Sequence, residues 1–262
     1  MKTGPLTRTW LMLLLFTGLA GCTQPRDTQD SSLSLATPQH AGFGHYTLAL
    51  TWQPGFCNGP HGPSCTPDQP RTPLIGLHGL WASRPPELIR NNTPVTQWWQ
   101  KGCALYEPDQ PVQHPALSPE TADALNRLVP RTQSDLTAHE YSKHVRCFGT
   151  DPERFFQVAI ALHDRFTSLQ AAHSLDAAAG TTISRQDILN RITAGTGPVP
   201  DRAIQFRCEN TTEGRPQLTQ IWFTLRPDAL SDFPHSQAFM SSPQMQDNCP
   251  ARFLLPAWPG IH

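Results

Sequence analysis

Seven cysteines constrain the fold of this chain more than any other feature of its sequence. One of them, Cys22, ends a short apolar N-terminal segment, and the other six lie further along the chain. Lys2 and Arg8 precede the apolar run, which is too short to span a bilayer, so residues 1–21 are typical of an export signal. Six cysteines in an exported protein predict disulfides formed in an oxidising compartment such as the periplasm. They allow fifteen pairings, and the residues by themselves do not choose among these.

The end of the apolar segment adds an expectation about Cys22. Leu19, Ala20, Gly21 and Cys22 resemble the lipobox of bacterial lipoproteins, in which cleavage precedes a cysteine that then carries lipid. The alternative is cleavage after Ala20, which would leave Cys22 as an unpaired thiol. Because an even number of cysteines remains without Cys22, we favour lipidation. The acyl chains would then anchor the protein to a membrane of the bacterial cell envelope, on the periplasmic side.

The rest of the chain divides into a tether and one domain. Residues 22–44 are polar and rich in small side chains, which indicates a flexible tether. Residues 45–262 are enough for a sizeable core within a single domain. The formal net charge is −1, so no global basic field points to nucleic acid. An enzyme that acts on nucleic acid still needs only a local basic site.

Local patterns predict a mixed fold. Apolar and polar residues alternate from Tyr46 to Trp52, as in a half-buried strand. Further strands are expected at residues 73–78, 203–208 and 218–225, the last two as antiparallel partners. A capping side chain before a proline begins two expected helices, at Ser118 and Asp151, and Ser184 begins a third. Strands and helices do not alternate regularly, so an α+β fold is favoured over a doubly wound sheet.

The segment HEYSKHVRCFG, residues 139–149, concentrates ionisable side chains. His139 and His144 lie one position further apart than the histidines of the zinc motif H-E-x-x-H, so a regular helix places them about 140° apart. Glu140 shares a helix surface with Lys143 and with His144. The segment therefore groups an acid, a cation and a titratable imidazole. The plain alternative is a solvated charged surface with an ion pair.

A second segment, LHGLWAS, residues 77–83, carries His78 and Trp81. His78 follows an apolar stretch and precedes Gly79, so its imidazole is expected at a strand end beside a flexible residue. Taken alone, this segment is weak evidence for a functional site. A histidine among apolar residues is more often a hydrogen-bonded core group, and a tryptophan more often packs in the core.

Together the two segments resemble the two active-site segments of the ribonuclease T(2) family. HGLW is followed about sixty residues later by H-E-aromatic-x-K-H-x-x-C, and LTWQPGFC, residues 50–57, is similar to the first strand of periplasmic bacterial members. The resemblance extends over residues 44–252 in the order of elements and the placement of cysteines. It implies a ribonuclease T(2)-like α+β fold, in which helices flank a central antiparallel sheet and disulfides staple the chain.

The resemblance also implies an activity. RNA carries its own nucleophile, the 2′-hydroxyl, so cleavage to a 2′,3′-cyclic phosphate requires a base, an acid and positive charge, without a metal or other cofactor. Imidazoles suit the first two tasks because they titrate near neutrality. By similarity, His144 is the general base and His78 the general acid. Glu140, Lys143 and His139 position and stabilise the phosphate.

Partners follow from the same resemblance. Trp81 is expected to stack on the base 5′ of the cut, a contact open to any base. The expected partners are single-stranded RNA as substrate and, through Cys22, the membrane, and the protein is expected to be a monomer. The other histidines, His45 included, are interpreted as surface or core groups.

The resemblance implies three disulfides, which join Cys57 with Cys65, Cys103 with Cys147, and Cys208 with Cys249. The chain also departs from the family. Ala82 replaces a usual proline, and Val145 and Arg146 replace a glycine and a small residue. Valine in place of a glycine with positive φ would be strained, so the end of the catalytic helix is expected to differ. Arg146 would either strengthen phosphate binding or face solvent.

Two other functions compete with ribonuclease activity. One is a catalytically inactive envelope lipoprotein that binds a partner through the same fold, as would follow if Val145 and Arg146 distort the site. The other is a metal-dependent hydrolase, which the spacing of His139 and His144 disfavours. Sensitivity to a chelator separates the metal enzyme from the ribonuclease. Loss of turnover in His78→Ala separates either enzyme from a binding protein.

Overall fold

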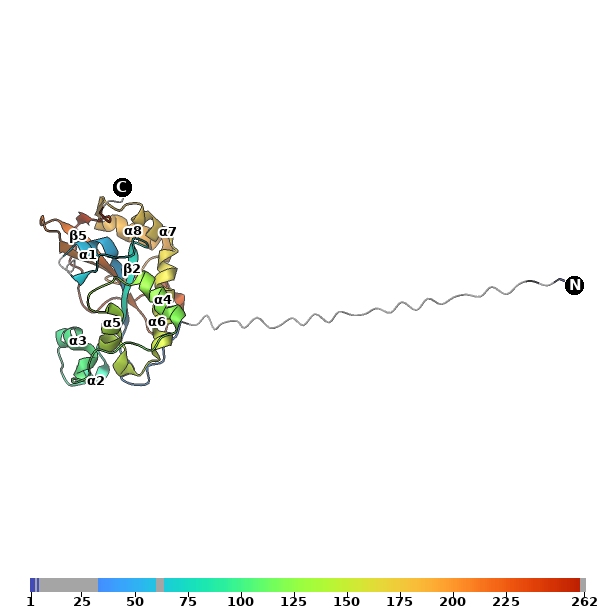
Figure 1. Ribbon diagram of the computed structural model, residues 1–262, viewed down its shortest axis with the longest axis horizontal. Helices are drawn as coiled ribbons and strands as arrows, with labels where there is room; N and C mark the ends of the chain where they lie inside the picture. Colours follow the sequence, from blue (N-terminus) through green and yellow to red (C-terminus); the bar gives the residue numbers. More distant parts are fainter. Residues whose placement is uncertain (3, 5–32, 60–63, 260–262) are drawn as a thin grey trace. The chain divides into compact units, whose positions relative to one another are not determined.

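A six-stranded sheet organises the described part of the chain (Figure 1). Its strands are β1 (Tyr46–Trp52), β2 (Ile75–Ala82), β3 (Thr182–Ser184), β4 (Ile204–Asn210), β5 (Pro216–Leu225) and β6 (Arg252–Leu254). They follow the order β2-β1-β5-β6-β3, and β4 also pairs with β5. All pairings are antiparallel except that of β5 with β6. The computed structural model describes residues 1, 2, 4, 33–59 and 64–259, and Ser32–His262 form one unit.

Helices surround this sheet, which confirms the expected α+β class. They are α1 (Gln53–Asn58), α2 (Pro86–Arg90), α3 (Val95–Lys101), α4 (Pro119–Leu128), α5 (Leu136–His144), α6 (Pro152–Thr167), α7 (Gln170–Asp176) and α8 (Arg185–Thr196). Short 3-10 turns are η2 (Gly102–Leu105), η3 (Arg146–Phe148), η4 (Leu230–Asp232) and η5 (Ser236–Ala238). In Figure 1, α2 and α3 lie at one end of the domain and α7 and α8 at the other. No helix among the described residues is long and apolar enough to cross a membrane.

The side chains of β1 alternate between two faces of the sheet, but the expected half-buried strand is wrong, because six of its seven residues are buried, Ala49 and Thr51 of the second face included. Leu48 and Leu50 are fully buried and point to the core, where Leu48 pairs with Phe223 of β5. Helix α6 packs on this face, and its Phe166 ring lies 4.9 Å from the Phe223 ring. The opposite face of β1 carries Thr47, Ala49 and Thr51, and the candidate site is built there.

Side-chain caps fix where the three expected helices begin. Ser118 accepts a hydrogen bond from the Thr121 amide at 3.2 Å, and Asp151 accepts one from the Arg154 amide at 2.7 Å. The Ser184 hydroxyl accepts in the same way at the start of α8. Each bond satisfies an amide that a helix N-terminus leaves unpaired, so these helix starts could be read from the sequence.

Part of the expected tether packs against the domain. Leu33 and Phe43 are buried, and the Thr150 hydroxyl donates to the carbonyl of Ala36 at 2.9 Å. These residues lie outside any helix or strand, so no periodic pattern of apolar residues in the sequence predicted their contacts with the domain. The domain therefore includes residues before 45.

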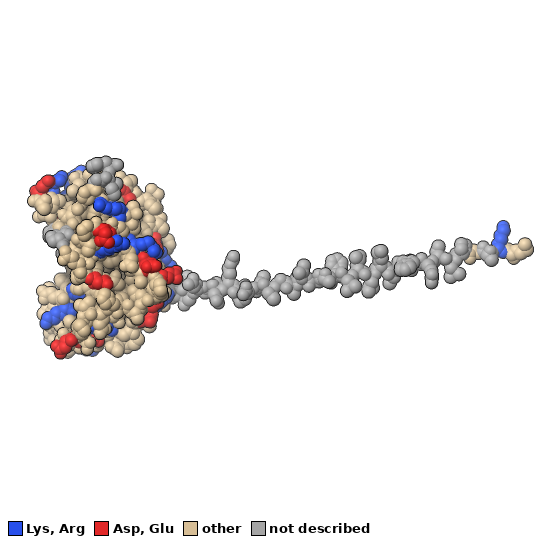
Figure 2. All heavy atoms as spheres, in the orientation of Figure 1, with Lys and Arg blue, Asp and Glu red and all other residues tan. Residues whose placement is uncertain are grey.

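Charges are mixed on the surface. In the view of Figure 2, Lys and Arg side chains are interspersed with Asp and Glu, as the net charge of −1 suggests. On this face, attraction of an anionic ligand would therefore depend on local groups.

Candidate active site

A bulge in β2 directs His78 into the site. Ala49 of β1 pairs with Gly79 and Leu50 pairs with Leu77, so His78 has no opposite residue. In a regular strand, residues three positions apart point to opposite faces. The extra residue breaks this alternation, and His78 and Trp81 contact each other with ring centroids 5.4 Å apart.

Glu140 of α5 lies between these two side chains. Its carboxylate accepts a hydrogen bond from the Trp81 indole at 2.5 Å and lies 3.4 Å from His78 Nε2. The Thr51 hydroxyl lies 3.4 Å from the other ring nitrogen of His78. Gly79 permits this approach, because a Cβ there would lie 2.3 Å from Glu140 Oε2. Glycine is therefore required for close packing, rather than for the flexibility expected of it.

The remaining groups of α5 reach the same place. The Asp135 side chain caps this helix by accepting from the Ala138 amide at 3.0 Å. The His144 ring lies 5.4 Å from the Trp81 ring at a tilt of 33°. Lys143 forms no ion pair with any residue that the structure describes, so its charge is available to a ligand.

Burial and neighbouring charges set the protonation of these groups. Burial alone would raise the pKa of the Glu140 carboxyl, but interaction with His144, His78 and the Trp81 indole outweighs it and lowers that pKa. Burial lowers the pKa of His144, against the effect of Glu140. Burial likewise lowers the pKa of His139. At neutral pH the site therefore holds a carboxylate, Glu140, and a neutral imidazole, His144.

One cavity of about 420 Å³ brings all of the predicted site residues together. Its volume is typical of small-molecule sites. The predicted residues that line it are His78, Trp81, His139, Glu140, Lys143 and His144. Other lining residues were not predicted, and the aromatic ones are Trp98, Trp99 and Trp222. His45, interpreted from sequence as a surface or core group, also lines the cavity.

Trp222 could have been found from the sequence. On β5 it lies opposite Ala49, on the face that carries Gln220 and Thr224, where a large apolar ring is out of pattern. It meets Trp81 edge to face at 5.3 Å. The guanidinium of Arg207 lies 5.0 Å from its ring centroid, and its indole donates to Gln220 at 2.6 Å. Trp222 is thus held from two sides.

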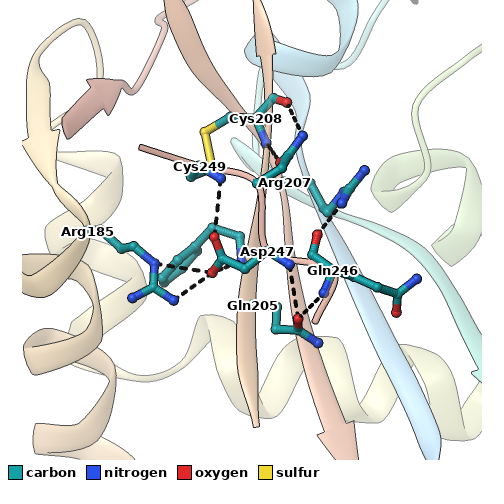
Figure 3. Close-up of polar contacts among 9 residues, drawn as sticks. Arg185, Gln205, Arg207, Cys208, Gln246, Asp247 and Cys249 are labelled. Atoms are coloured by element: carbon teal, nitrogen blue, oxygen red, sulfur yellow. Dashed lines mark hydrogen bonds and ion pairs between the residues drawn. A yellow bond between two sulfur atoms is a disulfide. The ribbon is translucent and has the colours of Figure 1, made fainter. Parts of the chain in front are cut away.

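The cavity is closed on the β4 side by residues 243–248, here called the wall segment. Pro243, Gln244 and Gln246 line the cavity. The Gln205 side-chain oxygen accepts from the amides of Gln246, at 2.6 Å, and Asp247, at 3.0 Å (Figure 3). The guanidinium of Arg207 donates to the Gln246 carbonyl. β4 therefore holds the backbone of the wall segment through two side chains.

Asp247 ties the wall segment to α8 and again to β4. Its buried carboxylate accepts from Arg185 at 2.7 Å, from the Phe206 amide at 3.0 Å and from the Cys249 amide at 3.2 Å (Figure 3). Cys249 forms a disulfide with Cys208 of β4. The bonds of Asp247 to Arg185 and to the Phe206 amide were not predicted, because they join residues 62 and 41 positions apart.

All three expected disulfides are confirmed. They join Cys57 with Cys65, Cys103 with Cys147, and Cys208 with Cys249. The second is the one beside α5. Gly102, next to Cys103, has φ +52°, and a Cβ there would lie 2.1 Å from the carbonyl oxygen of Lys143. The turn η2 therefore packs directly on the end of the helix that carries Lys143 and His144.

The departures from the family pattern do not strain the site. Val145 is buried with φ −125°, so the positive φ that would strain valine is absent, and Gly149 takes a left-handed conformation instead. Arg146 follows neither expectation. It donates to Glu107 at 2.6 Å and to the Pro111 carbonyl at 2.9 Å, with its side chain only 11% exposed. Ala82 is the buried last residue of β2.

Within the part of the chain that the structure describes, no group of three or more His, Cys, Asp and Glu side chains is arranged to hold a metal ion. Cys22 and nearly all of residues 1–21 lie outside the described residues.

Solved structures share the fold. A self-incompatibility-associated SF11-RNase of Nicotiana alata superimposes with a TM-score of 0.56 at 19% identity, over 82% of this chain and 100% of that one. RNase NT, solved in complex with 5′-AMP, superimposes with a TM-score of 0.55 at 16% identity, over 82% of this chain and 98% of that one.

Sequence relatives point the same way. Ribonuclease I of Escherichia coli (strain K12) is 28% identical over 86% of this chain and 90% of its own length. Ribonuclease S-F11 of Nicotiana alata is 25% identical over 73% of this chain and 90% of its own length. The sequence model of the Ribonuclease T2 family matches residues 43–237, which include both segments with the predicted catalytic residues, 77–83 and 139–149, but not the wall segment. On this match, the chain belongs to the ribonuclease T2 family.

Proposed function

We propose that this protein is an endoribonuclease that cleaves single-stranded RNA and leaves 2′,3′-cyclic phosphate ends. One observation carries the proposal. The imidazoles of His78 and His144, the ionised carboxylate of Glu140 and an ammonium that forms no ion pair with any described residue line a single cavity beside the half-buried indole of Trp81. Membership of the ribonuclease T2 family supports RNA as the substrate class.

The neutral state of His144 and the ionised state of Glu140 support one assignment of the proton transfers. The neutral ring of His144 accepts the proton of the 2′-hydroxyl, whose oxygen attacks the adjacent phosphorus. The bond from phosphorus to the 5′ oxygen breaks, and His78 donates a proton to that oxygen. Glu140, 3.4 Å from His78 Nε2, stabilises the positive charge that His78 carries before the transfer. The products are a cyclic phosphate and a 5′-hydroxyl.

Other residues bind rather than transfer protons. Lys143 supplies positive charge to the phosphate oxygens, where negative charge develops in the transition state. His139, which lines the cavity one turn before Lys143, contacts the phosphate region. Trp81 stacks on the base 5′ of the cut, in an orientation fixed by its bond to Glu140.

The test compares RNA with an all-deoxy oligonucleotide of the same sequence. The purified, disulfide-bonded protein is incubated with each in excess EDTA between pH 4 and 8, and the new ends are analysed. We expect cleavage of RNA alone, with cyclic phosphate ends. His78→Ala should lower kcat by about 10²- to 10⁴-fold, the usual contribution of a general acid. His173→Ala, an exposed histidine outside the cavity, is the matched control.

Two results would contradict the proposal. Loss of activity in EDTA would point to a metal-dependent hydrolase. Absence of cleavage by demonstrably folded, oxidised protein would favour a non-catalytic protein that binds a partner through this fold.

We also propose that the protein resides in the bacterial cell envelope, anchored through lipid on Cys22. The lipobox-like segment supports this proposal. Mass spectrometry of the N-terminal peptide from membrane fractions should find acylated Cys22. Recovery of unmodified protein in the soluble fraction would contradict it.

A further inference from the structure

The wall segment places Gln246, a residue with an unused side-chain amide, at the cavity. Both backbone groups of Gln246 are engaged, its amide with Gln205 and its carbonyl with Arg207 (Figure 3). The side-chain amide of Gln246 forms no hydrogen bond with any residue that the structure describes, although the residue is half-buried and lines the cavity. A polar group left unpaired at a cavity wall is suited to bind a ligand.

The backbone beneath this amide is fixed before any ligand arrives. The Gln205 side chain accepts hydrogen bonds from the amides of Gln246 and Asp247. The buried carboxylate of Asp247, the residue after Gln246, is bound in turn to α8 and β4. Removing the Gln246 side chain would break none of these bonds, because all of them use its backbone or its neighbours. The network therefore fixes the backbone that carries this side chain, so that binding needs to order only the rotamers of Gln246 itself.

The ligand that this arrangement fits is the edge of a nucleobase. Trp81 and Trp222 line the same cavity as Gln246, and Arg207 contacts both Trp222 and the Gln246 carbonyl. Unstacked RNA bases are recognised by stacking on an aromatic ring and by hydrogen bonds to their exposed edges. A base on Trp81 would take its stacking from the indole and its edge contact from the wall segment.

We propose that Gln246 binds the Watson–Crick edge of the nucleobase that stacks on Trp81. The inference rests on the proposed function, which supplies RNA as the ligand. A glutamine amide offers a donor beside an acceptor. Each of the four bases presents a donor beside an acceptor on its Watson–Crick edge, so the amide pairs with any of them after rotation. Gln246 then adds affinity for a base without selecting one.

The variant Gln246→Glu turns this tolerance into a measurable preference. A carboxylate only accepts hydrogen bonds. Guanine alone presents two neighbouring donors, its N1–H and its 2-amino group, to such an acceptor. Relative to the native protein, kcat/KM for GpU should rise about tenfold against ApU, CpU and UpU, the usual discrimination of a bidentate contact. The series UpN, varied at the 3′ base, should show no such change.

The comparison uses the ratios of kcat/KM for GpU to kcat/KM for ApU, CpU and UpU. An added negative charge near the phosphate affects all four substrates alike, so it cancels in these ratios. Gln237→Glu is the matched control, because Gln237 is exposed, lies in η5 and does not line the cavity. It should leave all ratios unchanged. Gln246→Leu, which removes the polar group, should lower kcat/KM for all four NpU substrates by similar factors.

Equilibrium binding separates this inference from the proposed function. Calorimetry with the four 3′-mononucleotides requires no turnover, and Gln246→Glu should favour 3′-GMP by about tenfold. That shift in a protein that does not cleave RNA would overturn the proposed function and support the base contact. Unchanged ratios in both assays, or a shift at the 3′ base of UpN, would overturn the role of Gln246.

Discussion

Replacing Cys103 and Cys147 together by alanine should weaken both stability and catalysis. Their disulfide spans a sequence separation of 44 residues. The chain-entropy model gives about 4 kcal/mol of stabilisation for a loop of this length. A domain typically unfolds with about 5–15 kcal/mol, so the variant should remain folded at low temperature but tolerate much less urea.

The catalytic loss follows from where the disulfide lies. Cys147 is three residues beyond His144, and the neighbour of Cys103, Gly102, packs against the carbonyl of Lys143. Without the covalent link, η2 and the end of α5 can separate. The side chains of Lys143 and His144 then lose their fixed positions. A displacement of about 1 Å can cost a reaction about 100-fold, so we expect kcat to fall by this order.

A second pair of alanines provides a matched comparison. Cys208 and Cys249 are separated by 41 residues, so the same model again gives about 4 kcal/mol. This disulfide holds the wall segment instead of α5. Urea unfolding should show similar losses for both variants, whereas kcat on RNA, measured where both are fully folded, should fall only without Cys103 and Cys147. Full kcat in that variant, or equal losses in the two, would refute the reasoning.

Three further predictions concern single side chains. Trp81→Phe keeps a ring but removes the hydrogen bond to Glu140, and urea unfolding should show a loss of about 1.5–3 kcal/mol; an unchanged midpoint would contradict this. Burial lowers the pKa of His45 from 6.5 to about 4, so the unfolded chain takes up a proton first and stability falls as the pH drops through this range. Between pH 7 and pH 5, the free energy of unfolding of His45→Asn should therefore fall by about 2 kcal/mol less than that of the native protein. If urea unfolding shows the same pH dependence for both proteins, this prediction is wrong. Arg146→Met should lower stability by about 1–3 kcal/mol and leave kcat intact, because Arg146 is paired with Glu107; slower cleavage would instead place it at the phosphate.

The sequence predicted those features that depend on local patterns. Ser118, Asp151 and Ser184 cap helices because a short polar side chain satisfies nearby amides wherever it precedes a helix. The alternation in β1 gave the orientation of its side chains. The site residues and the disulfide pairs came from the family resemblance, which carries information about contacts that no local pattern holds.

Features that depend on tertiary contacts escaped prediction. Spacing alone places His78 and Trp81 on opposite faces, and only the bulge, set by pairing with β1, brings them together. The wall segment shows no signal of its own, since Gln246 acquires its place through Gln205 and Arg207. Val145 escapes strain because the chain turns at Gly149 instead, which a single substitution from the family pattern cannot reveal.

The wall segment follows His78 and Glu140 in the chain, and this order affects when the proposed activity can begin. A ribosome makes His78 and Glu140 well before it makes Trp222 and Gln246. An active ribonuclease still attached to the ribosome would endanger the message being translated. Since Pro243, Gln244 and Gln246 line one side of the cavity, the growing chain carries His78 and Glu140 before that side is in place. The order of synthesis thereby delays the proposed activity until residues 243–248 have been made.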